Sequence, residues 1–149
     1  MAANGSCLLL LAILLFAETA AAQHESPLSA IREGHWLEVR GDYAGEGRFA
    51  AQRVDIIPSQ RYEVIIGTVS ERGKEGSFKL LDRSVEVVDK TDFDKLDPDK
   101  IVGQRVKVEA YYLGGNRLEA REVSPRGEGR ERIVGRADRV RTVADGLQV

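Results

Sequence analysis

Hydrophobic and polar residues alternate over several short segments of this chain, which predicts β-strands. Leu37 and Val39 alternate with charged residues, and Val106 and Val108 do the same further along. This period of two is typical of a strand with one buried face. Glycine-rich turn signals follow at residues 45–47 and 114–116. Each segment is therefore predicted to be the first strand of a hairpin.

The return strand of each hairpin carries the same break in its pattern. Phe49 and Ala51 share one face, but the next apolar residue, Val54, has the opposite parity. The same spacing recurs in the second hairpin, at Leu118, Ala120 and Val123. Because a β-bulge shifts the parity of a strand by one residue, we predict a bulge in both return strands.

The two hairpins belong to an internal repeat. Residues 34–54 align without a gap on residues 103–123, with seven of the 21 positions identical. Residues 66–67 likewise correspond to residues 134–135. We predict a partial repeat with the fourth and fifth strands of a unit at residues 23–57, a complete unit at 61–124, and a partial repeat with the first and second strands at 131–149.

The complete unit has the strand order of an OB-fold, a small barrel of five strands. Between its third and fourth strands lies a polar segment, in which Thr91 is expected to cap a short helical turn. Phe93 and Leu96 then face inward, and Pro98 ends the turn. The predicted fold class is all-β: a five-stranded OB-like barrel with a short helical turn between strands 3 and 4, flanked by partial repeats that form β-hairpins. The alternative is a β-sandwich or an open meander.

The partial repeats leave strand edges without partners, and such edges favour self-association. Three explanations compete: the chain is a piece of a longer repeat protein, its two halves pair into a second barrel, or the halves exchange with another chain. Together they supply four strands and lack the third strand of a unit. We therefore favour truncation or an open, extended sheet over a closed second barrel.

The N-terminal segment is expected to direct export. Residues 7–17 carry no charge and are followed by small residues up to Ala22. A membrane-spanning helix needs about 20 apolar residues, so the run instead matches the hydrophobic region and cleavage site of a signal peptide. We predict a signal peptide at residues 1–22 and a periplasmic or extracellular mature protein without a transmembrane span. The alternatives are an uncleaved anchor and a start codon assigned at the wrong place.

Composition limits the chemistry of the mature chain. The full chain of 149 residues has 22 Lys and Arg, 24 Asp and Glu, two His and one Cys. Its net charge of -2 gives no bulk attraction for polyanions. The single cysteine, Cys7, lies within the predicted signal peptide, so neither a disulfide nor thiol chemistry is expected after cleavage.

The repeated segments resemble a bacterial family, the domain of unknown function 5666, which occurs in exported proteins and often in tandem. The resemblance is carried by IIGTV at 65–69, LLDRSVEVVDKTDF at 80–93, IVGQRVKVEA at 101–110 and RLEAREV at 117–123. These are strand patterns without a catalytic signature, so the resemblance implies an OB-like fold and export but no active site. The chain departs from the family pattern at Leu81-Asp82, where a Leu-Gly pair is common, and at Ala110, where Gly41 keeps the usual glycine.

The sequence holds no recognisable catalytic or metal-binding pattern. His24 and His35 are too few for a zinc site, and no G-x-S-x-G segment or isolated carboxylate pair is present. An acidic segment lacks the glycine and the final glutamate of an EF-hand loop and is interleaved with lysines, so a solvated turn is favoured there. Its carboxylates are Asp89, Asp92, Asp94, Asp97 and Asp99. We expect a protein that is not an enzyme and has no metal and no cofactor.

Nucleic-acid binding is not expected either. Seven arginines lie between residues 121 and 141, but acidic residues are interspersed among them. OB-folds that bind nucleic acid use aromatic residues on their second and third strands. Here those strands offer only Phe78, which is predicted to face inward.

The best candidate for a ligand or partner surface is aromatic and consists of Trp36, Tyr43, Tyr111 and Tyr112. Trp36 has the outward parity of its charged neighbours, and the tyrosines lie at the hairpin ends. Trp and Tyr are favoured anchors of interfaces. Alternatively, Trp36 covers the neighbouring unit and the tyrosines support the hairpin corners.

These observations predict an exported, non-catalytic module that acts as a binding or spacer element of the bacterial cell envelope. Its partner would be an envelope protein or a glycan. One alternative is a solute- or glycan-binding protein that uses the aromatic residues with the loops at residues 72–75 and 114–116. A hydrolase or a nucleic-acid binder is the weaker alternative.

Overall fold

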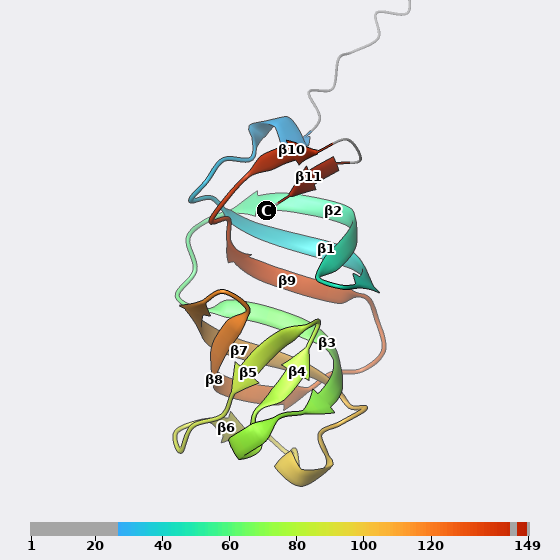
Figure 1. The fold of residues 1–149 in the computed structure, drawn as a ribbon, viewed down its shortest axis with the longest axis vertical. Helices are drawn as coiled ribbons and strands as arrows, with labels where there is room; N and C mark the ends of the chain where they lie inside the picture. Colours follow the sequence, from blue (N-terminus) through green and yellow to red (C-terminus); the bar gives the residue numbers. More distant parts are fainter. Residues whose placement is uncertain (1–26, 144–145, 149) are drawn as a thin grey trace, which may run out of the picture.

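Short strands joined by tight turns make up nearly the whole structure, a computed structural model that describes residues 27–143 and 146–148 (Figure 1). Its strands are β1 (Trp36–Gly45), β2 (Arg48–Ile57), β3 (Glu63–Arg72), β4 (Phe78–Leu80), β5 (Arg83–Glu86), β6 (Asp92–Phe93), β7 (Arg105–Gly114), β8 (Arg117–Pro125), β9 (Glu131–Arg136), β10 (Arg141–Val143) and β11 (Gly146–Gln148). Its three short 3-10 helices are η1 (Pro27–Ala30), η2 (Lys74–Gly76) and η3 (Pro98–Lys100). The predicted signal peptide and His24 lie outside the described residues. Among the described residues, no helix is long and apolar enough to cross a membrane.

Five strands close into a barrel. β3 pairs with β4, β4 with β5, β5 with β8, β8 with β7, and β7 again with β3. All these pairs are antiparallel except β5–β8, which is parallel. The prediction of an all-β protein with a five-stranded OB-like barrel is confirmed.

The barrel core follows from the alternating pattern of its strands. Along β7, buried Val106, Val108 and Ala110 alternate with residues that remain partly exposed. Every barrel strand adds apolar side chains to this core, among them Ile65, Phe78, Val85 and Leu118, each exposed by 1% or less. Burying a side chain of this size contributes about 1.5–3 kcal/mol relative to leaving it in water.

Both predicted bulges are present at equivalent positions. The register of β1–β2 shifts between Arg40 and Gly41, and that of β7–β8 shifts between Glu109 and Ala110. At the first bulge the strands approach so closely that a Cβ on Gly41 would lie 2.1 Å from the Ala50 carbonyl oxygen. Glycine is therefore required there, whereas Ala110 fits within the barrel core.

The helical turn between the third and fourth barrel strands is present but begins at Pro98 instead of ending there. Proline is favoured at the first position of a helix, and the Asp97 carboxylate caps this one by accepting the Asp99 N–H at 3.0 Å. Thr91 is not a cap: its hydroxyl donates to the Ala120 carbonyl at 2.7 Å and accepts the Val88 N–H at 3.0 Å. It thereby holds the segment between β5 and β6 against β8.

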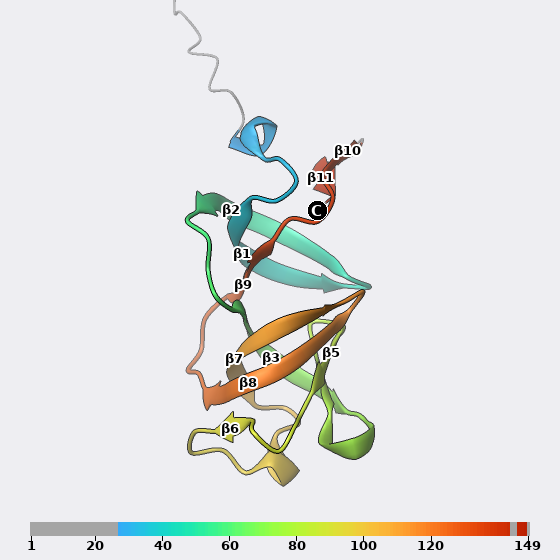
Figure 2. The same ribbon diagram turned by 90° about the vertical axis from the view of Figure 1, so that its left-hand side faces the viewer.

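The flanking segments extend the barrel sheet outward. β9 pairs with β3 of the barrel on one side and with β1 on the other, and β2 forms the outer edge (Figure 1). Figure 2 shows hairpin β1–β2 in the upper half and hairpin β7–β8 in the lower half, on either side of this junction. The N- and C-terminal partial repeats thus pair with each other in an open sheet. Their predicted boundaries stay predictions.

Candidate functional site

The structure places the four predicted aromatic residues in separate environments. Trp36 is half-buried at the start of β1, opposite Ile57 and Arg136. Tyr43 lies near the other end of the same strand. Tyr111 and Tyr112 are consecutive on β7, so their side chains lie on opposite faces. The four residues therefore do not form one continuous surface.

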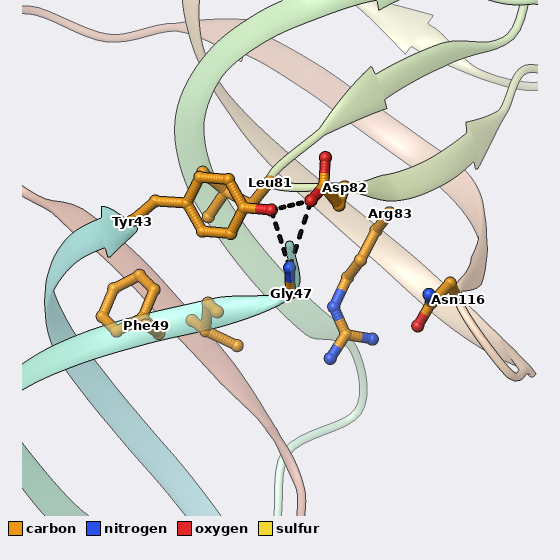
Figure 3. Close-up of a pocket in the computed structure, with 8 residues that line it drawn as sticks. Tyr43, Gly47, Phe49, Leu81, Asp82, Arg83 and Asn116 are labelled. Atoms are coloured by element: carbon orange, nitrogen blue, oxygen red, sulfur yellow. Dashed lines mark hydrogen bonds between the residues drawn. The ribbon is translucent and has the colours of Figure 1, made fainter. Parts of the chain in front are cut away.

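Tyr43 joins the outer hairpin to the barrel. Its hydroxyl donates a hydrogen bond to the Asp82 carboxylate, and the Gly47 N–H lies 3.1 Å from that carboxylate and 3.0 Å from the tyrosine oxygen (Figure 3). Burial, followed by the contact with Asp82, raises the pKa of the Tyr43 hydroxyl. The same hydrogen bond lowers the pKa of the Asp82 carboxyl.

A strained turn presents Asp82 to Tyr43. Leu81 and Asp82 form the two-residue connection between β4 and β5, and both have positive φ, at 51° and 60°. Such hairpin turns favour glycine and asparagine, and aspartate tolerates this conformation better than most residues. Leu81 meanwhile packs over Gly67, where a Cβ would lie 2.9 Å from its Cδ2 atom. Asp82, which stands where the family pattern commonly has glycine, therefore supplies the carboxylate that binds Tyr43.

A pocket opens beside this contact, between the outer hairpin and the barrel (Figure 3). It is lined by Tyr43, Gly47, Phe49, Leu81, Asp82, Arg83, Asn116 and Ile133. The Tyr43 hydroxyl and the Asp82 carboxylate are bonded to each other and to the Gly47 N–H. The Tyr43 hydroxyl and the Asp82 carboxylate thus use their hydrogen bonds to hold hairpin β1–β2 against the barrel.

A second polar group lies where β3 meets β9. Glu63 is only 9% exposed, and its carboxylate lies against Gly135, whose added Cβ would be 3.2 Å from the Glu63 Oε1 atom. Burial raises the pKa of Glu63, while the positive charge of Arg83 and the N–H of Arg136 act in the opposite direction. The pKa of Tyr112 is also raised, first by burial and then by the neighbouring Asp138.

Tyr111 belongs to an exposed cluster of aromatic and arginine side chains. Its ring meets that of Tyr62 edge-on at a centroid distance of 5.1 Å. The guanidinium carbons of Arg121 and Arg61 lie 4.8 Å and 5.2 Å from the centre of the Tyr62 ring. Tyr111 is 42% exposed, so this cluster presents an aromatic side chain next to positive charge.

Sequence reasoning missed Tyr62, Glu63 and Asp82. Tyr62 and Tyr111 are far apart in the sequence and come together because Glu63 pairs with Ala110 across β3–β7. Assigning a register to the first and fourth barrel strands would have found this contact. Asp82 was visible only as a departure from the family pattern, without an indication of its partner.

Two carboxylates of the acidic segment form ion pairs. Asp99 pairs with Arg72 at 2.7 Å, and Asp97 pairs with Lys100 at 3.4 Å. The imidazole of His35 accepts the Arg32 N–H through its Nδ1 atom at 3.2 Å. Within the described part of the chain, no group of three or more metal-type side chains is arranged to hold a metal ion.

Comparison with protein-family models gives a match along the barrel. Residues 66–124 match the model of a family described as a domain of unknown function, DUF5666. The match runs from β3 to β8 and therefore covers most of the barrel. Neither the curated proteins nor the solved structures gave a match.

Proposed function

We propose that this protein, which resembles the DUF5666 family along its barrel, is an exported, non-catalytic module that serves as a binding or spacer element of the bacterial cell envelope. One observation carries the proposal. The side chains with the chemistry of a general acid or base, Tyr43, Asp82 and Glu63, lie at the junction of the outer sheet with the barrel. These side chains hold the outer sheet on the barrel, and we assign them no part in a reaction. A catalytic group would instead be free to contact a substrate.

Export is supported by the sequence alone. The uncharged run at residues 7–17 and the small residues before Gln23 fit a secretory signal. Without Cys7 the mature chain depends on its packed core, which suits a compartment where free thiols are oxidised.

Fractionation of a bacterium that expresses the full chain tests export. We expect the mature form to begin near Gln23 and to be recovered outside the cytosol. The control is Leu11→Arg, which places a charge in the apolar run and should retain the protein in the cytosol. Recovery of the wild-type chain from the cytosol with residues 1–22 intact would contradict export.

A second candidate function is glycan or solute binding at the cluster of Tyr62, Tyr111, Arg61 and Arg121. The exposed Tyr111 ring beside two guanidinium groups favours it, because sugars stack on aromatic rings and anionic groups pair with arginine.

Co-sedimentation of residues 23–149 with insoluble cell-wall glycan separates binding from a spacer role. If the cluster binds glycan, Tyr111→Ala should reduce the bound fraction, whereas the matched change Tyr112→Ala, on the opposite face of β7, should leave it unchanged. The fluorescence of Trp36, the single tryptophan, reports any contact that reaches the outer sheet. No retention and no fluorescence change would favour the spacer.

A further inference from the structure

We propose that the outer edge of β2, which no other strand of residues 27–143 and 146–148 pairs with, is a docking site for an extended strand of a partner polypeptide. The docked strand takes the place that β5 occupies in the barrel. The proposal deepens the binding role proposed above but does not depend on export. Failure of strand docking would leave the spacer role intact, and failure of export would leave the docking site intact.

The outer sheet repeats the strand registers of the barrel. Gly135 of β9 lies opposite Leu37 of β1, just as Gly67 of β3 lies opposite Val106 of β7. The bulges of β1–β2 and β7–β8 also fall at corresponding positions. β1, β2 and β9 are thus arranged like the fourth, fifth and first strands of the barrel.

The turns that lead into these strands agree as well. The Gly34 N–H donates to the Ala137 carbonyl at 2.7 Å, and the Gly103 N–H donates to the Val69 carbonyl at 2.9 Å. Each glycine has positive φ and follows a 3-10 helix that begins with proline. The buried isoleucine after each helix, Ile31 or Ile101, is only 2% exposed. The outer half therefore reproduces most of a unit.

Among the described residues, no strand lies beside β2 in the way that β5 lies beside β8. In the barrel, β5 lies parallel to β8, with Val85 opposite Leu118. The corresponding residues of β2 are Arg48–Ala50. Within residues 27–143 and 146–148, β2 pairs only with β1 and forms the edge of the sheet. The β5–β8 pair of the barrel thus shows how a docked strand would pair with β2.

Side-chain exposure shows what a docked strand would cover. Ala120 of β8 is 1% exposed, whereas its counterpart Ala51 is exposed. Leu118 is completely buried, whereas its counterpart Phe49 is half-buried. An added strand gains backbone hydrogen bonds from the edge and buries these apolar positions, as in recognition by strand addition.

The side chains of β5 indicate what kind of strand would dock on β2. Val85 points into the core, and the Glu86 carboxylate binds the Arg117 guanidinium at 2.7 Å. The counterpart of Arg117 is Arg48, which pairs only with the largely exposed Glu46 among the ion pairs of the described residues. We therefore infer an extended partner segment, parallel to β2, with an aliphatic residue over Phe49 followed by an acidic residue that meets Arg48.

A peptide with the sequence of residues 80–88, LLDRSVEVV, is the probe. Its binding to the chain of residues 23–149 is measured by fluorescence anisotropy, and the contacted residues are located by NMR. We expect saturable binding with chemical-shift changes along β2. A peptide with the change Val85→Asp should not bind, because its charge would enter the apolar site.

Two neighbouring alanines provide matched variants. Ala51→Glu places a charge where the barrel has a buried alanine and should weaken binding at least about tenfold. Ala50→Glu introduces the residue that the barrel carries at the corresponding position, Glu119, and should change affinity by less than about twofold. Both alanines are exposed, so both variants should keep the wild-type Tm.

A charge exchange tests the acidic residue of the partner. A peptide with Glu86→Lys should bind the wild-type protein more weakly and recover affinity on the Arg48→Glu variant. Absence of peptide binding, equal binding to the Ala51→Glu and Ala50→Glu variants, or shift changes confined to the barrel would overturn the proposal. A dimer formed through β2 without peptide would also overturn it, in favour of a second copy as the occupant.

Discussion

Ile65 of β3 lies directly opposite Ile133 of β9 in the antiparallel pair that joins the barrel to the outer sheet. The two isoleucines precede equivalent segments, residues 66–67 and 134–135, and so occupy the same position in their respective halves. Opposed residues of an antiparallel pair are related by a local two-fold axis. The barrel and the outer sheet are therefore related by an approximate two-fold rotation about this isoleucine pair.

Equivalent residues of the two halves should contribute unequally to stability. Val108 is completely buried in the barrel, whereas its counterpart Val39 is half-buried in the outer sheet. We expect Val108→Ala to lower the free energy of unfolding by about 2 kcal/mol, because it leaves a cavity, and Val39→Ala to cost less than half of that. Urea denaturation measures both. Equal losses would show that the two halves are covered equally.

The Tyr43–Asp82 contact should stabilise attachment of the outer hairpin. Tyr43→Phe removes the hydroxyl and should lower Tm by about 2–6 °C. Adding Asp82→Ala to this variant should cost less than the same change in the wild type, since the two residues share one interaction. Thermal unfolding of the wild type, both single variants and the double variant gives this comparison. Strict additivity would mean that the contact contributes nothing.

The same contact should give a characteristic dependence on pH. Because the pKa of Asp82 is lowered from 3.8, its contribution is present above that value and is lost as acid protonates the folded state. Because the pKa of Tyr43 is raised from 10.0, its contribution is present below that value and is lost as the folded tyrosine ionises. Tm profiles of wild type and Tyr43→Phe should therefore differ most between these limits. A difference independent of pH would contradict this assignment.

Glu63 should destabilise the protein at neutral pH. Its pKa is raised from 4.5 by burial, so folding favours the protonated form, and stability declines as pH rises through the folded pKa. Glu63→Gln removes the charge and keeps an oxygen for the Arg136 N–H. We expect this variant to have a Tm about 2–4 °C above the wild type at pH 7 and no advantage below about pH 4. A lower Tm at pH 7 would indicate that the attraction of Arg83 outweighs the cost of burial.

Gly41 should resist substitution more strongly than the corresponding Ala110. A Cβ on Gly41 would lie 2.1 Å from the Ala50 carbonyl oxygen, so Gly41→Ala must displace one strand of the hairpin. We expect a loss of about 2–3 kcal/mol in the free energy of unfolding. Ala110→Gly, the reverse change at the equivalent bulge, should cost about 1 kcal/mol through backbone entropy. A neutral Gly41→Ala variant would show that the bulge can open.

Local patterns account for what the sequence predicted well. The alternation along β7 and the parity shifts at Val54 and Val123 depend on neighbouring residues of one strand, so strands, bulges and barrel order were accessible. Pairing of β9 with both β1 and β3 was not, since it depends on which edges meet in space. The Tyr43–Asp82 contact and the Tyr62–Tyr111 cluster depend on those pairings and on a turn with positive φ. The periodicity of the sequence does not predict either contact.

The pairing of β1 with β9 has a consequence for the order of folding. Leu37 and its partner Gly135 are separated by 98 positions, and such distant contacts form slowly because a long loop must close first. The barrel strands all lie within residues 63–125, so the barrel can close without β9. Hairpin β1–β2, although made first, must wait for the last part of the chain before its inner edge is covered. We therefore expect this hairpin to remain open to chaperones and proteases longer than any other strand pair of the sheet.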